Sequence, residues 1–331
     1  SSPKGPVMNR QETNGSTASD RQPSLAQPAR RDFLKSMGAV SVGWAAAAGT
    51  ARAASPAETD RLPQVPFGKH RISRLVCGSN TFNAGSHLSV FVNEEMRTYY
   101  QPEQIMKTLR RFEELGGNCW QISGVHNLDL YRRYLDEGGQ MQIISLGRDP
   151  KELPLLAKAG CVGVAHHGEV SDQLLKSGKL DEMHDFLKAV RDSGMMVGVS
   201  THMPAVVDAV ESKGWDIDYY MTCIYERHRT DEELKKLLGC VPLPPREVYL
   251  REDPPRMFKA IQATKRTCLA FKILAAGRLS DRKEWVDQAF RETFAGIKTG
   301  DAVIVGIYDR YRDQLGENAA LVRKYGAAKG A

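Results

Sequence analysis

Histidine residues gather at the ends of short apolar segments in this sequence, where their side chains could transfer protons or bind a metal. The chain has eight histidines, and five of them lie at or just beyond the end of such a segment. These five are His126, His166, His167, His202 and His228. A neutral imidazole accepts a proton or binds a divalent metal near neutral pH. The clustering therefore favours a histidine-centred functional site.

Four of the polar side chains at segment ends form one candidate ligand set: His126, His167, His202 and Glu226. Neutral imidazoles together with one carboxylate suit zinc, iron or manganese. No H-x-H or H-E-x-x-H spacing is present, so we keep two interpretations, a divalent-metal site and a metal-free acid/base site. Gln121 and Lys272 also end apolar segments, and we count them with His126 and His167 as candidate catalytic residues.

The elements that must position these residues are eight short apolar segments that alternate with amphipathic ones. The predicted strands cover 72–80, 118–123, 141–147, 161–167, 195–202, 218–225, 267–275 and 302–308. Between them, apolar residues recur at helical spacing, as in Ile105, Leu109 and Phe112. The predicted fold is a single closed (β/α)8 TIM barrel of the α/β class. An open doubly wound sheet is the alternative, although no G-x-G-x-x-G follows the first strand.

In such a barrel the C-terminal ends of the strands meet on one face, which is where reacting groups belong. The period-two alternation of a strand predicts that His167 and His202 point inward and that His166 points outward. A long insertion, residues 226–254, separates the sixth strand from the sixth helix. It is predicted to be a lid or substrate-binding loop over the site, or else a rigid surface segment or an oligomer contact.

The N-terminal residues predict an export route. Residues 30–36 begin with Arg30-Arg31 and precede an apolar run, and Ala51-Arg52-Ala53 offers a small-x-small cleavage pattern. This order resembles a twin-arginine signal peptide. The resemblance implies recognition by the twin-arginine translocase and a periplasmic or extracellular location.

Three parts follow from this reading: residues 1–53 as leader, 54–66 as a flexible tether and 67–331 as the barrel. The formal net charge is +6, but the leader holds seven Lys/Arg against three acids, which leaves 39 basic and 37 acidic side chains. Because basic and acidic side chains outside the leader are nearly equal in number, the charge gives no reason to expect nucleic-acid binding. No apolar run after the leader reaches the about 18 residues of a membrane span. We therefore expect a small-molecule substrate, no nucleic acid and no stable membrane span.

Several segments of the predicted barrel are similar to the aldo/keto reductase family. Residues 67–78 (FGKHRISRLVCG) are similar to that family's first-strand motif, and residues 270–277 (AFKILAAG) to its aYsPLgxG stretch. Val305-Gly306 with Glu317-Asn318 is similar to the closing iPG…eN segment. The resemblance implies a (β/α)8 barrel and an NAD(P)-dependent oxidoreductase.

The catalytic positions of that family hold other residues in this chain. Gln121 stands where the resemblance places an aspartate, and His126 where it places the tyrosine that protonates the product. The family's lysine falls near Ser145 and is missing. That set works because a cation and a carboxylate tune the pKa of the phenol. Its loss argues against ordinary reductase chemistry, with His126 remaining as a substitute acid.

The resemblance also implies a set of cofactor-binding residues. These are Phe271, Lys272, Arg310, Glu317 and Asn318. Phe271 stands at the position that stacks on nicotinamide, and Lys272 is placed to contact a phosphate. Asp309 falls in the segment that recognises the 2′-phosphate, where a carboxylate would repel that group unless Arg310 compensated.

The sequence therefore predicts an exported barrel enzyme acting on a small polar, carbohydrate-like molecule through a histidine-centred site. The divalent metal is part of one version of that site. An aldo/keto-reductase-type oxidoreductase with a tightly bound NAD(P) is the first alternative. A non-catalytic binding barrel is the second.

Overall fold

The fold, taken from a computed structural model, is described for residues 61–243 and 247–327. Eight parallel strands close into a barrel in the order of the chain: β3 (Leu75–Gly78), β4 (Cys119–Ser123), β5 (Gln142–Gly147), β6 (Gly163–His166), β7 (Met196–Thr201), β8 (Tyr219–Cys223), β9 (Thr267–Phe271) and β10 (Ala302–Gly306). The last strand pairs in parallel with the first, with Val303 opposite Leu75, which closes the ring. The fold is thus the predicted (β/α)8 TIM barrel. The export signal expected in residues 1–53 lies outside the described residues.

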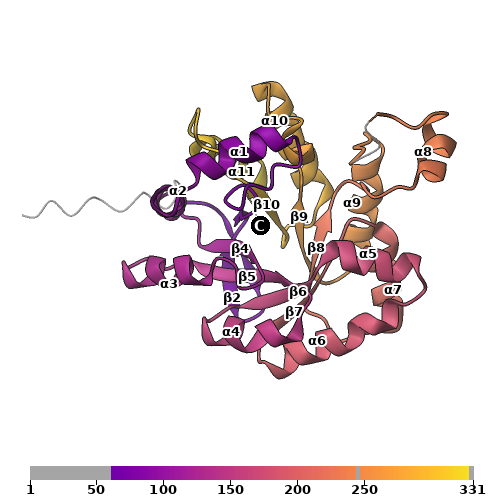
Figure 1. The fold of residues 1–331 in the computed structure, drawn as a ribbon, viewed down its shortest axis with the longest axis horizontal. Coiled ribbons are helices and arrows are strands. Elements are labelled where there is room, and N and C mark those ends of the chain that lie inside the picture. Colours follow the sequence, from indigo (N-terminus) through magenta and orange to yellow (C-terminus); the bar gives the residue numbers. More distant parts are fainter. Residues whose placement is uncertain (1–60, 244–246, 328–331) are drawn as a thin grey trace, which may run out of the picture. The chain divides into compact units, whose positions relative to one another are not determined.

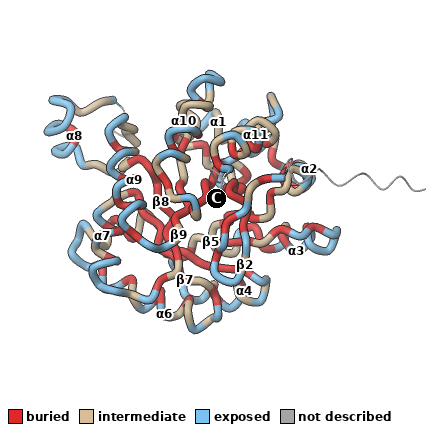
Figure 2. The backbone as a smooth tube through the Cα atoms, turned by 180° about the vertical axis from the view of Figure 1, so that it is seen from behind, coloured by how far each residue is buried: buried red, intermediate tan, exposed pale blue. Residues whose placement is uncertain are grey.

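Helices surround the strands in Figure 1. They are α1 (Val90–Tyr99), α2 (Pro102–Glu114), α3 (Leu128–Asp136), α4 (Leu153–Lys158), α5 (Gly168–Lys176), α6 (Met183–Asp192), α7 (Pro204–Lys213), α8 (Asp231–Leu238), α9 (Asp253–Ala263), α10 (Lys283–Gly296) and α11 (Gln314–Gly326). In α2, Ile105, Leu109 and Phe112 are buried, as their helical spacing predicts. Figure 2 shows buried residues along the strands and exposed residues on the outer helices.

Side chains of the strands alternate between two apolar layers. In β6, Ala165 belongs to the inner layer of the barrel, whereas Val164 belongs to the layer between strands and helices. His166 also faces outward, because its Nδ1 lies 2.7 Å from Ser171 Oγ and its ring packs edge-on against Phe186. The alternation therefore agrees with the outward orientation predicted for His166.

An antiparallel hairpin packs against the inner layer beside the start of β7, and the sequence analysis missed it. It consists of β1 (Gln64–Phe67) and β2 (His70–Ser73), with the Phe67 ring packed edge-on against Tyr219 at 4.8 Å. The hairpin begins inside the segment expected to be a tether. It also splits the expected strand 72–80 at Arg74, whose backbone nitrogen donates to the carbonyl oxygen of Pro63 in the hairpin and whose carbonyl oxygen accepts from Val303 of β10. The Arg74 side chain donates to the carbonyl oxygens of Asp301, Lys298 and Gly326.

Two glycines in the strands make room for a core tyrosine. A Cβ atom at Gly198 would lie 2.4 Å from Tyr219 Cζ, and one at Gly163 would lie 3.1 Å from Tyr219 Cε1. Any larger side chain at Gly198 would displace the ring from the barrel interior. The space beside these glycines is therefore filled by packing.

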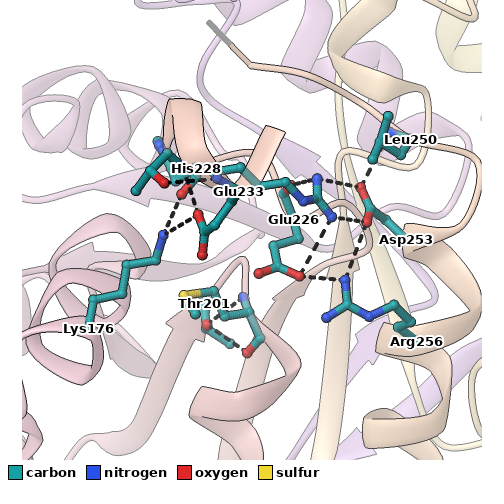
Figure 3. A network of polar contacts seen from close by, with 11 residues as sticks. Lys176, Thr201, Glu226, His228, Glu233, Leu250, Asp253 and Arg256 are labelled. Carbon is teal, nitrogen blue, oxygen red and sulfur yellow. Dashed lines mark hydrogen bonds and ion pairs between the residues drawn. The ribbon is translucent and has the colours of Figure 1, made fainter. Parts of the chain in front are cut away.

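The insertion between β8 and α9 carries α8 and is tied to the barrel at both ends. Figure 3 shows this network, in which Lys176 Nζ donates to the carbonyl oxygen of His228 at 2.6 Å. Arg229 is paired with Asp253, the first residue of α9, and Arg256 donates to Glu226 at 2.6 Å. The insertion is thus anchored by polar contacts on the side of the barrel where the strands end, and among them the Arg229–Asp253 pair is buried.

Among the described residues, no helix combines the length and the apolar character needed to cross a bilayer. All six cysteines are free thiols. Five of them are buried, as their apolar surroundings in the sequence predict, while Cys240 is exposed beyond α8.

Candidate active site

A histidine–aspartate pair lies where β7 ends. His202 follows that strand, and its Nδ1 lies 2.7 Å from Asp172 Oδ2 on α5. The same carboxylate accepts hydrogen bonds from Thr201 Oγ1 at 2.5 Å and from the backbone nitrogen of His202 at 3.2 Å. Both side chains are almost completely buried, so the carboxylate holds the imidazole in one orientation.

The surroundings of this pair favour a neutral imidazole. Burial lowers the pKa of His202 well below its ordinary value, and the positive charge of Arg227 acts in the same direction. Burial raises the pKa of Asp172 to about 6, against its hydrogen bond from Thr201. Near neutral pH the pair is therefore a carboxylate that accepts the Nδ1–H of a neutral ring. Nε2 then carries the lone pair and can act as a base.

Lys272 is a second candidate reactive group. It follows β9 directly, with its backbone in the left-handed region (φ +57°), which is uncommon for a residue with a side chain. Burial lowers the pKa of its amine to about 8, and the nearby Arg227 and Arg278 lower it further, whereas Cys223 and Glu247 oppose them. Within the described residues the amine has no hydrogen bond and no ion pair.

Loops from three strands meet above Lys272, and Glu247 joins two of them. This carboxylate, in the insertion, lies 2.7 Å from His87 Nδ1 in the first loop and accepts hydrogen bonds from Arg227 and from Tyr249 (3.1 Å). Burial opposes its charge, but the bond to His87 and the Arg227 cation hold the pKa of Glu247 at about 2. The carboxylate therefore stays ionised and holds the insertion to the first loop.

Arg278 contributes the third loop. Its guanidinium donates to the carbonyl oxygen of His87 at 3.1 Å and lies over the Tyr249 ring at 4.4 Å. The left-handed backbone of His87 (φ +58°) and of Glu247 (φ +49°) shows that these contacts stabilise conformations that side chains rarely allow.

A cavity of about 410 Å³ opens beside this arrangement, lined by residues from the ends of β3, β4, β9 and β10. Gln121, Lys272, His87 and Phe271 are among its lining residues. His202 is not among the lining residues, but its ring lies 5.5 Å from that of Phe271, which is, so the histidine–aspartate pair is next to the cavity. The volume is within the usual range for small-molecule sites.

The residues expected to bind a metal are only partly brought together. His167 and His202 belong to the same charged cluster, and Nδ1 of His167 is buried without a partner among the described residues. His126 is exposed in the turn before α3, and Glu226 is paired with Arg229 and Arg256. In residues 61–243 and 247–327 no group of three His, Cys, Asp or Glu side chains is placed to hold a metal ion.

The residues expected to bind a cofactor divide in the same way. Phe271, Lys272 and Asn318 line the cavity, whereas Arg310 pairs with Glu95 and Glu317 pairs with Arg312 and Lys283. A further expectation needs correction. Asp309 does not face the cavity, because its carboxylate accepts hydrogen bonds from Tyr100 (3.0 Å) and Thr108 (2.9 Å).

Sequence reasoning missed Asp172, Arg227 and Glu247. Asp172 lies on α5, and its partner His202 is 30 residues away. Glu247 meets His87 across 160 residues. The sequence offers one signal for Arg227, which is its place beside Glu226 just past a strand end.

No protein-family model and no curated protein matches this chain. Several solved barrels are similar to it. A truncated 3-deoxy-D-arabino-heptulosonate 7-phosphate synthase from Thermotoga maritima is 13% identical, with 80% of this chain and 91% of that chain covered and a TM-score of 0.46. The glycerol dehydrogenase of Gluconobacter oxydans, an aldo/keto reductase, is 11% identical, with 81% and 97% covered and a TM-score of 0.45.

The dihydropteroate synthase of Xanthomonas albilineans is 12% identical, with 81% of this chain and all of that chain (100%) covered and a TM-score of 0.47. At these identities the similarity concerns the barrel alone, and the same barrel carries unrelated activities. The assignment of the fold rests on the strand pairing of this chain, and its function must be argued from the site.

Proposed function

We propose that this barrel is an enzyme that transfers protons to and from a small polar, carbohydrate-like substrate, with His202 as the base. The observation that carries the proposal is the buried Asp172–His202 pair at the end of β7. A histidine whose Nδ1 is held by a carboxylate keeps its Nε2 lone pair free, which is the arrangement that general-base catalysis uses.

The neighbourhood of the pair supports this proposal. The adjacent cavity has the volume of a small ligand, and its polar lining residues include Gln121, Asn80 and Lys272. Arg227 is a nearby cation, and it would stabilise negative charge that develops on a substrate oxygen when a carbon-bound proton leaves. A metal-free site built on His202 does not depend on His126, which is exposed, or on Glu226, which is paired with two arginines.

Proton transfer can be measured before the natural substrate is known. The full-length protein, incubated in D2O with a panel of aldoses, ketoses and sugar acids, is expected to exchange a carbon-bound hydrogen of at least one compound, as followed by NMR. His202→Asn should lower the exchange rate by about 10²- to 10⁴-fold, the usual contribution of a general base. His184→Gln, on the outer helix α6, is the matched control and should keep the wild-type rate. Equal rates in the His202 variant and the wild type would refute the role of His202.

The bound-cofactor oxidoreductase is the second candidate, because Phe271, Lys272 and Asn318 line one cavity. An aromatic ring and a cation are groups that would contact a nicotinamide ring and a phosphate. Arg310, expected to bind a phosphate as well, is instead engaged by Glu95 at 2.7 Å. The test is the ultraviolet spectrum and mass spectrum of small molecules released when the native protein is denatured. Release of stoichiometric NAD(P) would favour this function over the first.

A further inference from the structure

We propose that Lys272 is an amine nucleophile that forms an imine with a small carbonyl substrate of the 2-oxo acid type, whose carboxylate binds at Arg227. This inference rests on the proposed function, because it uses the same face of the barrel, and it names the substrate class. It does not follow from the resemblance noted in the sequence, where Lys272 was expected to contact a phosphate.

The first argument is the isolation of the Lys272 amine. Most buried lysines are paired, since an uncompensated ammonium group is costly to bury. Lys298, for example, is largely buried and lies 3.1 Å from Asp301 Oδ2. Lys272 lines the cavity and has no hydrogen bond or ion pair within the described residues. An unpaired amine in an apolar wall beside other cations is the environment that activates catalytic lysines.

The groups that face Lys272 come from three elements. Arg227 and Glu247 belong to the loop after β8, Arg278 to the loop after β9, and Cys223 to β8 itself. Glu247 is already engaged by His87, Arg227 and Tyr249, and burial raises the pKa of Cys223 to about 12, so its thiol stays neutral. The two arginines therefore disfavour the ammonium form, and no free carboxylate among these groups restores it.

The second argument is a set of unused polar atoms around Arg227. Its side chain is only 8% exposed, and one guanidinium nitrogen binds Glu247, yet Nε is buried without a partner among the described residues. His228 Nε2 and His167 Nδ1 are also buried without partners there. A buried donor without an acceptor, as Arg227 Nε is, costs about 1–3 kcal/mol, so it favours a ligand that supplies an acceptor, and the two imidazole nitrogens can donate to the same ligand in the matching tautomers. A carboxylate supplies two oxygens and compensates the excess of cations.

The third argument is the backbone of Lys272. Its φ of +57° is followed by left-handed residues at Ala275 and Ala276, and the turn is closed by a hydrogen bond from Ala275 N to Lys272 O at 2.7 Å. Glycine would occupy this position without strain. A lysine in a strained position at the edge of a cavity is typical of a functional constraint on the side chain.

The chemistry needs no oxidant or reductant. The lone pair of the neutral amine attacks the carbonyl carbon, the carbonyl electron pair moves to oxygen, and a proton passes from nitrogen to that oxygen. A second proton on the oxygen lets water leave, and the nitrogen lone pair completes the C=N bond. The protonated imine then acidifies the neighbouring C–H group, and His202 Nε2 can accept that proton. One amine, one carbonyl compound and one proton taken from solvent thus give one protonated imine and one water.

Reductive trapping tests the proposal on the full-length protein. Pyruvate, the smallest 2-oxo acid, is added with cyanoborohydride, which reduces imines, and the carboxyethylated lysines are mapped by peptide mass spectrometry. At about pH 7.5, an amine with a pKa of about 8 is roughly two hundred times more often neutral than an ordinary lysine with a pKa near 10.4. Lys272 should therefore be labelled at least tenfold faster than Lys298 or the exposed Lys179, and its labelling should level off above about pH 8.

Two variants protect this test against a folding artefact. Lys272→Arg keeps the charge, Lys272→Gly suits the left-handed backbone, and both should remain folded by circular dichroism while losing the label. Arg227→Met should reduce labelling by pyruvate several-fold more than labelling by acetaldehyde, which has no carboxylate. Equal labelling of all lysines would overturn the proposal, and an unchanged pyruvate-to-acetaldehyde ratio would overturn its anionic part. Failure of trapping with intact, His202-dependent exchange would leave the proposed function standing.

Discussion

Replacing Asp172 by asparagine is expected to reduce turnover by about 10²- to 10⁴-fold without unfolding the barrel. The carboxylate accepts four hydrogen bonds, from Thr201 Oγ1, the backbone nitrogen of His202 (to both oxygens) and His202 Nδ1. An asparagine oxygen can keep the bonds from Thr201 and from the backbone. Its NH2 group then faces Nδ1 of His202 and must donate to it.

That change moves the ring proton. With Nδ1 now an acceptor, the neutral imidazole carries its hydrogen on Nε2, and the lone pair needed for proton abstraction is lost. Two-bond ¹H–¹⁵N correlation spectra distinguish the two tautomers, so the cause of the lost activity can be observed directly. Thr201→Val is the matched control, since it removes one bond to the same carboxylate and leaves the tautomer unchanged. Turnover in Asp172→Asn within twofold of the wild type would contradict the role of the pair.

The barrel could be predicted because each of its units repeats one local pattern. The eight apolar segments contain or overlap all eight barrel strands, and the alternation within 195–202 places Val197 and Val199 in the outer layer, as observed. Position at a strand end also singled out His202 and Lys272. Such signals are local, because each strand and the helix that follows it repeat one pattern of apolar residues.

The partners of these residues could not be predicted, because their contacts are not local. Asp172 is a buried carboxylate on α5, and its partners Thr201 and His202 come from the next unit. Glu247 follows a proline-rich segment that predicts only a loop, yet it closes the insertion onto His87. For His126, position just beyond a strand end was a misleading signal, since the turn that begins with left-handed Gly124 carries this residue to the surface.

A non-local ion pair between Arg229 and Asp253 also holds the insertion to the barrel. The variant Arg229→Met is expected to weaken this attachment. Arg229 and Asp253 are 4% and 2% exposed, with Arg229 Nη1 3.2 Å from Asp253 Oδ2 and Nη2 on the other carboxylate oxygen. Removing one partner of a buried ion pair costs about 3–5 kcal/mol, because the remaining charge stays uncompensated. Arg256, which is half-exposed and 3.6 Å from Asp253, can replace only part of the interaction.

Because this pair joins the two ends of the insertion, most of the loss should appear as local opening of residues 226–252. Hydrogen exchange is expected to accelerate in α8 and around Glu247 by roughly 10²- to 10³-fold, which corresponds to about 3–4 kcal/mol of opening free energy. Arg97→Met, at an exposed pair with Glu94, is the matched control and should change stability by less than about 1 kcal/mol. The double variant Arg229→Met/Asp253→Leu should recover most of the protection, since an apolar pair leaves no buried charge. If Arg229→Met alone keeps wild-type protection in α8, the buried pair does not hold the insertion, and Glu247 must reach His87 and Arg227 without that support.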